Sequence, residues 1–137
     1  MNSASPRHPF ATLEYANAFG AGAEPVDVPA WRSVVLARSI PGTTLKDVTG
    51  CYPFAPLAVD SDLSVGLAQL RANGFLSVVL VTDPLRTPPI TALETSFDFC
   101  RAFKTHYAFD RNAGAVDMSR RHWREVRIAR ARWSSAA

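Results

Sequence analysis

The sequence has few cysteines, a modest share of charged residues and no long hydrophobic run, and each scarcity excludes a class of protein. Cys51 and Cys100 form neither a CxxC pair nor a Cys/His pair at metal-ligand spacing, which predicts two reduced thiols and no metal site. Charged residues make up 20% and hydrophobic residues 47% of 137 residues, a composition that suits one globular domain and excludes a disordered chain. The longest apolar run, residues 75–81, is far shorter than the roughly 20 residues that cross a membrane, and residues 1–9 show no apolar core of an export signal. We therefore expect a cytoplasmic protein without membrane contact.

Phosphate-binding signatures are also lacking. Neither the Walker pattern GxxxxGK[ST] nor the Rossmann pattern GxGxxG occurs in the sequence. The triplet Gly20-Ala21-Gly22 has no apolar strand before it, so we interpret its glycines as points of backbone flexibility.

Basic charge is concentrated at the C-terminus. Residues 119–137 contain six arginines against the single acidic residue Glu125, whereas residues 1–118 contain nine basic and eleven acidic side chains. Three interpretations of this segment remain open: a solvated surface helix, a helix that docks an acidic partner, and a helix that binds phosphates or nucleic acid. A non-enzymatic binding module that uses residues 119–133 in this way is therefore one candidate function.

The first half of the chain alternates strand and helix signals. Residues 1–30 are rich in alanine, glycine and proline and are expected to be irregular, apart from a short helix over residues 10–19. Strands are expected over residues 33–40 and 45–52. A helix is expected from Leu63, because Leu63, Leu67 and Leu70 recur at helical spacing after capping candidates at residues 60–62.

The second half continues the alternation. The β-branched run at residues 75–84 is typical of a strand buried on both faces, and a helix is expected over residues 90–99. Residues 103–110 alternate aromatic and polar side chains, which predicts a strand. A last helix is expected from a capping Ser119 to about residue 133, with one apolar stripe among the arginines. These elements predict a mixed α+β fold with a central mixed sheet and flanking helices.

Two of the expected strands contain candidate catalytic or binding residues. Lys104, His106 and Asp110 share one face of the expected strand, where His106 could carry a proton in a cleft; the alternative is a solvent-facing polar strand. Asp83, in the Thr82-Asp83-Pro84 triplet, ends the preceding strand, where α/β proteins often place functional groups; the alternative is a simple turn.

Four segments, taken in order, resemble one known family. They are LARSIPGTTLKDVTGCYPF at residues 36–54, VVLVTDPL at 78–85, FKTHYAFD at 103–110 and SRRHWREVRIA at 119–129. The order is similar to that of FemAB-like proteins of the GNAT acyltransferase superfamily, in which a TDPF-like strand end precedes an FKxHYxxD-like strand and a Ser-x-x-His, Arg-rich helix. The resemblance covers residues 36–130 and depends on the order and spacing of the segments together.

The resemblance implies a GNAT-like half-domain over residues 31–137 that transfers an acyl or aminoacyl group to an amine. Proteins of this kind usually have two related halves, so the chain would correspond to the N-terminal half. It would be incomplete and inactive until a second half, or a second copy of the chain, joins it.

The resemblance also implies roles for particular residues. His106 would be the catalytic base, and the substrate- or partner-binding residues would be Lys104, Asp110, Arg121, His122 and Arg124. Acyl-CoA or an aminoacyl-tRNA is implied as the acyl donor. The Arg/Gln-x-x-Gly-x-Gly/Ala loop that holds the donor pyrophosphate in GNAT enzymes is absent, so no cofactor is detectable from the chain itself.

Overall fold

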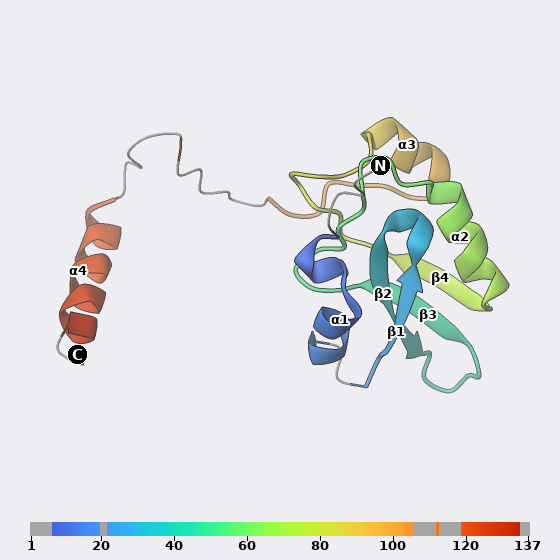
Figure 1. Cartoon of the computed structure of the whole chain (residues 1–137), viewed down its shortest axis with the longest axis horizontal. Coiled ribbons are helices and arrows are strands. Elements are labelled where there is room, and N and C mark those ends of the chain that lie inside the picture. The colour runs from blue at the N-terminus through green and yellow to red at the C-terminus, as the bar shows by residue number, and fades with distance from the viewer. Residues whose placement is uncertain (1–6, 20–21, 106–111, 113–118, 135–137) are drawn as a thin grey trace, which may run out of the picture. The chain divides into compact units, whose positions relative to one another are not determined.

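The computed structural model of the chain (Figure 1) describes residues 7–19, 22–105, 112 and 119–134. The chain divides into two units, Met1–Lys104 and Thr105–Ala137, and we describe each by itself. In the described residues, the first unit contains a sheet with flanking helices and the second contains the helix α4 (Arg120–Ser134). The mixed α+β class expected from the sequence is confirmed.

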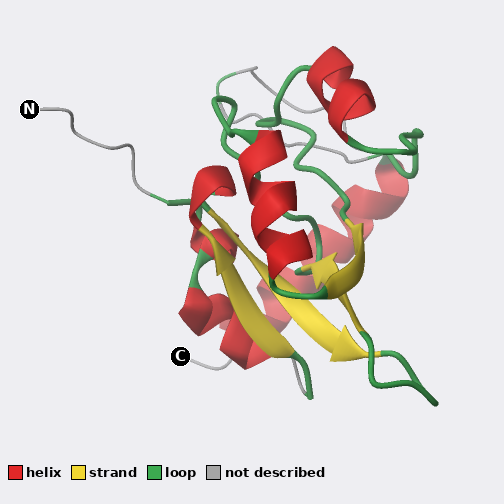
Figure 2. Ribbon diagram, turned by 90° about the vertical axis from the view of Figure 1, so that its right-hand side faces the viewer, coloured by secondary structure: helices red, strands yellow, loops and turns green. Residues whose placement is uncertain are grey.

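Among the described residues, the sheet of the first unit has four strands in the order β1-β2-β3-β4; Figure 1 labels these strands and Figure 2 shows them as yellow arrows. The strands are β1 (Glu24–Val28), β2 (Ser33–Ser39), β3 (Lys46–Gly50) and β4 (Phe75–Val79). β1, β2 and β3 are antiparallel neighbours, whereas β4 lies parallel to β3. Parallel neighbours need a crossover connection, and here a helix provides it.

Different helices cover the two faces of the sheet. The helices of the first unit are α1 (Leu13–Phe19), α2 (Leu63–Ala72) and α3 (Ile90–Ser96). Because successive side chains of a strand point to opposite faces, β2 contributes to both sides of the core. Val35 packs in one cluster with Leu63 of α2 and Leu93 of α3, whereas Leu36 packs in a second cluster with Ala16 of α1.

Helix α2 begins and packs as its sequence dictates. The Asp62 carboxylate accepts a hydrogen bond from the Val65 N–H at 3.0 Å, which caps the helix as predicted. The fully buried Trp31 lies against this helix and donates from Nε1 to the Leu63 carbonyl at 3.3 Å. Gly66 faces the indole, and a Cβ at this position would lie only 2.6 Å from Trp31 Cδ1. The absence of a side chain at residue 66 is therefore what allows the tryptophan to reach the core.

The expectation that residues 1–30 are irregular is wrong for much of this segment. Besides the expected helix, strand β1 lies within it and pairs with β2 along its whole length, from Glu24 opposite Ala37 to Val28 opposite Ser33. Pro25 suggested a break, but proline is tolerated in an edge strand, where its missing N–H falls on the solvent side. The expected helix over residues 10–19 is confirmed as α1 with a preceding short turn of 3-10 helix, Pro9–Ala11.

The expectation that residues 75–84 form a strand buried on both faces is also wrong. β4 is the edge strand of the sheet and covers only Phe75–Val79. Phe75 and Val78 pack against the core, but the side chains of Leu76 and Val79 are 63% and 66% exposed. Helix α1 packs mainly against β1 and β2 and does not cover these two side chains.

Towards the C-terminus, the outcomes differ by segment. The helix expected over residues 90–99 is confirmed as α3, and the helix expected after Ser119 is confirmed as α4. Of the strand expected over residues 103–110, residues 103–105 have no regular structure. The remaining residues, 106–110, lie outside the described part of the chain.

Candidate functional site

The carboxyl ends of β3 and β4 meet at one edge of the sheet, which is where open α/β sheets bind ligands. The two segments stay together beyond the strands, because the Ala55 N–H donates to the Val81 carbonyl at 2.7 Å and Ala55 pairs with Thr82. Gly50 approaches this pair so closely that an added Cβ would lie 2.7 Å from Ala55 Cβ. Residues 50–55 therefore form a fixed rim at this edge.

Lys104 is a predicted site residue that the fold brings to this rim. Its Nζ donates to the Pro53 carbonyl at 3.3 Å and lies 5.3 Å from the centre of the Tyr52 ring. An exposed cation at this distance from an aromatic face is attracted to it by about 0.5–1 kcal/mol. Because the Tyr52 side chain is 64% exposed, the rim presents both a positive charge and an aromatic face.

An aromatic cluster surrounds Tyr52. Its members are His8, Phe10, Tyr15, Phe19, Tyr52 and Phe54, with neighbouring ring centres 4.7 to 6.0 Å apart. The Tyr15 hydroxyl also donates to the Tyr52 carbonyl at 2.6 Å, which ties α1 to the rim. Sequence reasoning missed this cluster because it joins residues 8–19 to residues 52–54. The spacing of Tyr15 and Phe19, four residues apart on one helix, was the available signal.

Asp83 follows the carboxyl end of β4 and is only 4% exposed. Its carboxylate accepts a hydrogen bond from the Leu85 N–H at 2.8 Å, two residues along the chain. This local bond is that of an aspartate-initiated turn. The geometry thus supports the turn interpretation of Asp83.

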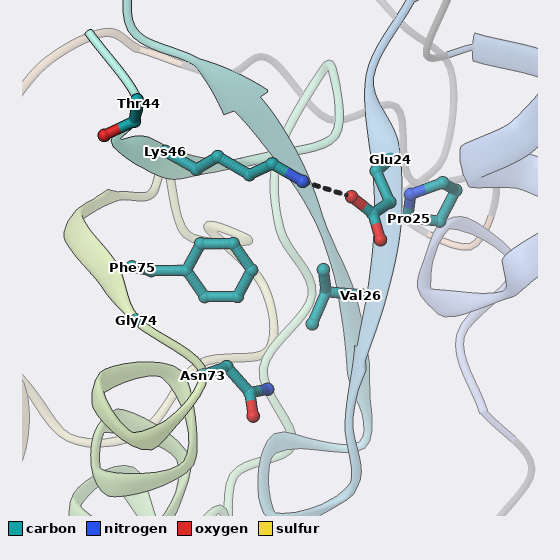
Figure 3. A pocket seen from close by; sticks show the side chains of 8 residues that line it. All are labelled: Glu24, Pro25, Val26, Thr44, Lys46, Asn73, Gly74 and Phe75. Carbon is teal, nitrogen blue, oxygen red and sulfur yellow. Dashed lines mark hydrogen bonds and ion pairs between the residues drawn. The ribbon is translucent and has the colours of Figure 1, made fainter.

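An open groove of about 550 Å³ lies at the opposite end of these strands (Figure 3). Its lining residues are Glu24, Pro25, Val26, Thr44, Lys46, Asn73, Gly74 and Phe75. Lys46 Nζ lies 2.8 Å from Glu24 Oε2, and this hydrogen bond lowers the pKa of the Glu24 carboxyl below its ordinary value. Both side chains are well exposed, so the pair adds little stability. The groove has a charged rim and the Phe75 ring within it, but its charges already neutralise each other.

A second hollow, of about 660 Å³, lies between the start of α2 and helix α3. Asp60 and Asp62 bring acidic charge to it. The hydrogen bonds from the Val65 N–H and the Ser64 hydroxyl lower the pKa of the Asp62 carboxyl, so this carboxylate already serves as the helix cap. Asp62 therefore has a structural role at this hollow, as the cap of α2.

The predicted site residues fall into three groups. Lys104 belongs to the rim of the first unit, Arg121, His122 and Arg124 lie on α4, and His106 and Asp110 lie outside the described residues. On α4, Ser119 Oγ accepts from the His122 N–H at 3.4 Å and lies 3.0 Å from His122 Nδ1. His122 is thus part of the helix cap.

Both cysteines are free thiols. Cys51 is buried, and desolvation raises the pKa of its thiol. Across the described residues, no group of three or more histidine, cysteine or acidic side chains is placed to hold a metal ion. The helices in the same residues include none with the length and apolar character needed to cross a membrane.

Comparisons with protein-family models, with curated proteins and with solved structures each find no match to this chain.

Proposed function

We propose that the chain is one half of an acyltransferase domain that transfers an acyl or aminoacyl group to an amine, and that a second copy completes it. The observation that carries this proposal is the edge strand β4. It is the last strand of the parallel β3-α2-β4 unit, lies at the border of the mixed sheet and exposes Leu76 and Val79 at 63% and 66%. Unpaired sheet edges with exposed apolar side chains favour pairing with another strand. The ordered resemblance to FemAB-like proteins supplies the reaction class.

The chemistry needs a base and a group that stabilises negative charge on the carbonyl oxygen. In the proposed reaction the amine nitrogen attacks the acyl carbon, His106 accepts the proton of the amine, and the bond to the donor sulfur or oxygen breaks. The leaving group takes up the proton as it departs. Lys104, two residues before His106 in the sequence, brings a cation to the rim at the carboxyl end of β3. Its charge suits the anionic groups of an acyl donor.

Acetyl-CoA is a suitable probe for this proposal. The oligomeric state is measured by sedimentation velocity from low to high micromolar protein, and thermal unfolding is then followed with and without acetyl-CoA. We expect a dimer at high concentration, and stabilisation by acetyl-CoA only where the dimer is present. At about one hundred times its dissociation constant, a ligand specific for the folded state adds about 2.7 kcal/mol to the free energy of unfolding.

Two variants test the role of the edge. Val79→Lys places a charge on β4, and Val59→Lys is the control because Val59 is similarly exposed, at 60%, but lies outside the sheet. We expect Val79→Lys to be monomeric and insensitive to acetyl-CoA, and Val59→Lys to behave like the unaltered chain. If acetyl-CoA stabilises a monomer, of either the unaltered chain or Val79→Lys, the need for a second copy is contradicted. If the unaltered chain is a dimer that acetyl-CoA does not stabilise, the acyl-donor site is contradicted. If the unaltered chain stays a monomer at every concentration, completion by a second copy is contradicted.

A further inference from the structure

Helix α4 carries a charged surface that extends beyond Arg121, His122 and Arg124, the residues for which the resemblance implies a binding role. It contains six arginines and one glutamate within 15 residues. Of residues 120–132, all but Val126 are exposed. Like charges one helical turn apart repel each other, which destabilises a helix unless an anion offsets the repulsion.

Three of the arginines share one face of the helix. Arg120, Arg124 and Arg127 recur at spacings of four and three residues, so their side chains follow one another along roughly 10 Å of the axis. We call these three residues the arginine face. Among the described residues, none of the three is part of a salt bridge. Arg121 lies on another side of the helix, because it is one residue, or about 100°, away from Arg120.

Trp123 adds an aromatic surface at the border of the arginine face. It is 48% exposed and lies four residues before Arg127, so the two side chains are neighbours along the helix. Arginine binds phosphate through two parallel hydrogen bonds. Aromatic side chains next to such cations stack on unpaired bases, which a duplex does not expose.

We propose that the arginine face and Trp123 of α4 bind single-stranded nucleic acid. The guanidinium groups contact successive phosphates, and the indole stacks on a base between them. An acidic protein surface would pair with the guanidinium groups but would make no use of the indole beside them. A helix that lies on an anionic lipid surface would have its indole on the side opposite the arginines, where it enters the lipid. The position of Trp123 next to the arginine face is therefore the observation that selects this partner.

Fluorescence anisotropy with the full chain tests the proposal, using labelled single-stranded RNA and DNA oligonucleotides of one mixed sequence and the matching duplex. If three phosphates are neutralised, the slope of log affinity against log salt is about −2.1, so a fourfold rise in salt weakens binding about 18-fold. Arg124→Gln removes one contact and reduces the slope by about 0.7. The matched control, Arg121→Gln, makes the same charge change on another side of the helix and changes the slope less. Trp123→Ala weakens single-strand binding by about fivefold or more and leaves duplex binding unchanged. Circular dichroism verifies that each variant keeps its helix content.

Several results would overturn the proposal. These are an absence of oligonucleotide binding, affinity that does not depend on salt, and equal effects of Arg121→Gln and Arg124→Gln. Unchanged single-strand affinity in Trp123→Ala contradicts the stacking contact, and binding to anionic phospholipid vesicles or polyglutamate in place of the oligonucleotides assigns the face to another partner. None of these measurements involves acetyl-CoA or β4, so their failure is distinct from failure of the proposed acyl transfer.

Discussion

The contact between Gly66 and Trp31 makes a sharp prediction about stability. Gly66→Ala introduces one methyl group on α2, where it would overlap Trp31 Nε1 and Cε2. The indole is fully buried and cannot move into solvent without leaving the core. Its N–H also donates to the Leu63 carbonyl, one helical turn before Gly66, so a shift of the ring breaks this hydrogen bond.

The magnitude follows from three opposing effects. Overpacking a dense core costs about 1–3 kcal/mol. A buried indole N–H that is left without an acceptor costs about a further 1–3 kcal/mol. Replacing a helical glycine by alanine returns about 1 kcal/mol through helix propensity. We therefore expect Gly66→Ala to lower the free energy of unfolding by about 1–5 kcal/mol, compared with the about 5–15 kcal/mol of a typical domain.

Urea unfolding followed by circular dichroism measures this loss. The double variant with Trp31→Phe identifies its cause, because phenylalanine lacks the five-membered ring that meets the new methyl group. We expect the double variant to be less destabilised than the sum of the two single variants, by at least about 1 kcal/mol. A Gly66→Ala chain as stable as the unaltered chain, or additive effects in the double variant, would refute the close contact.

Three further predictions concern the core, the cap and the thiols. In urea unfolding, Leu36→Ala should lower the free energy of unfolding by about 2–5 kcal/mol, because Leu36 is fully buried. Leu76→Ala should change it by under about 0.5 kcal/mol, because the Leu76 side chain is 63% exposed. Similar losses in the two variants would contradict the edge position of β4. The Asp62 pKa is lowered in the folded chain, so its stabilisation is present above the ordinary carboxyl pKa and is lost as the pH falls through the folded value. In thermal unfolding from pH 7 down through this acid range, Asp62→Asn should keep the helix cap at pH 7 and lose less stability in acid than the unaltered chain does. Asp62→Ala should have a lower melting temperature than the unaltered chain at pH 7. If the stability of Asp62→Asn depends on pH as that of the unaltered chain does, this role of Asp62 is contradicted. Burial raises the pKa of the Cys51 thiol, whereas Cys100 is partly exposed. A chromogenic disulfide reagent at mildly alkaline pH should therefore label Cys100 first. Equal labelling rates for the two thiols would disprove the burial of Cys51.

Much of the first unit could be predicted from local patterns. Leu63, Leu67 and Leu70 predicted α2 because helical spacing places them on one face, and the β-branched residues after Trp31 predicted β2. Each of these signals arises within a few residues of chain. The same holds for the cap at Asp62, whose partner is three residues away.

Features that depend on distant partners were less predictable. The run at residues 75–84 has the composition of a buried strand, but its burial depends on which helices and strands pack around β4, which composition does not encode. Pro25 concealed β1, because the rule against proline in strands is relaxed at an edge that only the whole sheet defines. The placement of Lys104 over Tyr52, 52 positions earlier in the chain, was likewise beyond local reasoning, although Lys104 itself was predicted as a site residue.

The two borders of the sheet have a consequence for assembly geometry. At β1, Pro25 removes a hydrogen-bond donor from the outer border, whereas β4 has no proline in Phe75–Val79. Two copies that join β4 to β4 across a twofold axis bury their unprotected borders and leave β1 at both outer sides. Neither outer side then offers a complete row of donors to a third copy. If the proposed β4-to-β4 pair forms, growth by strand addition would therefore end at two copies and would not continue into a filament.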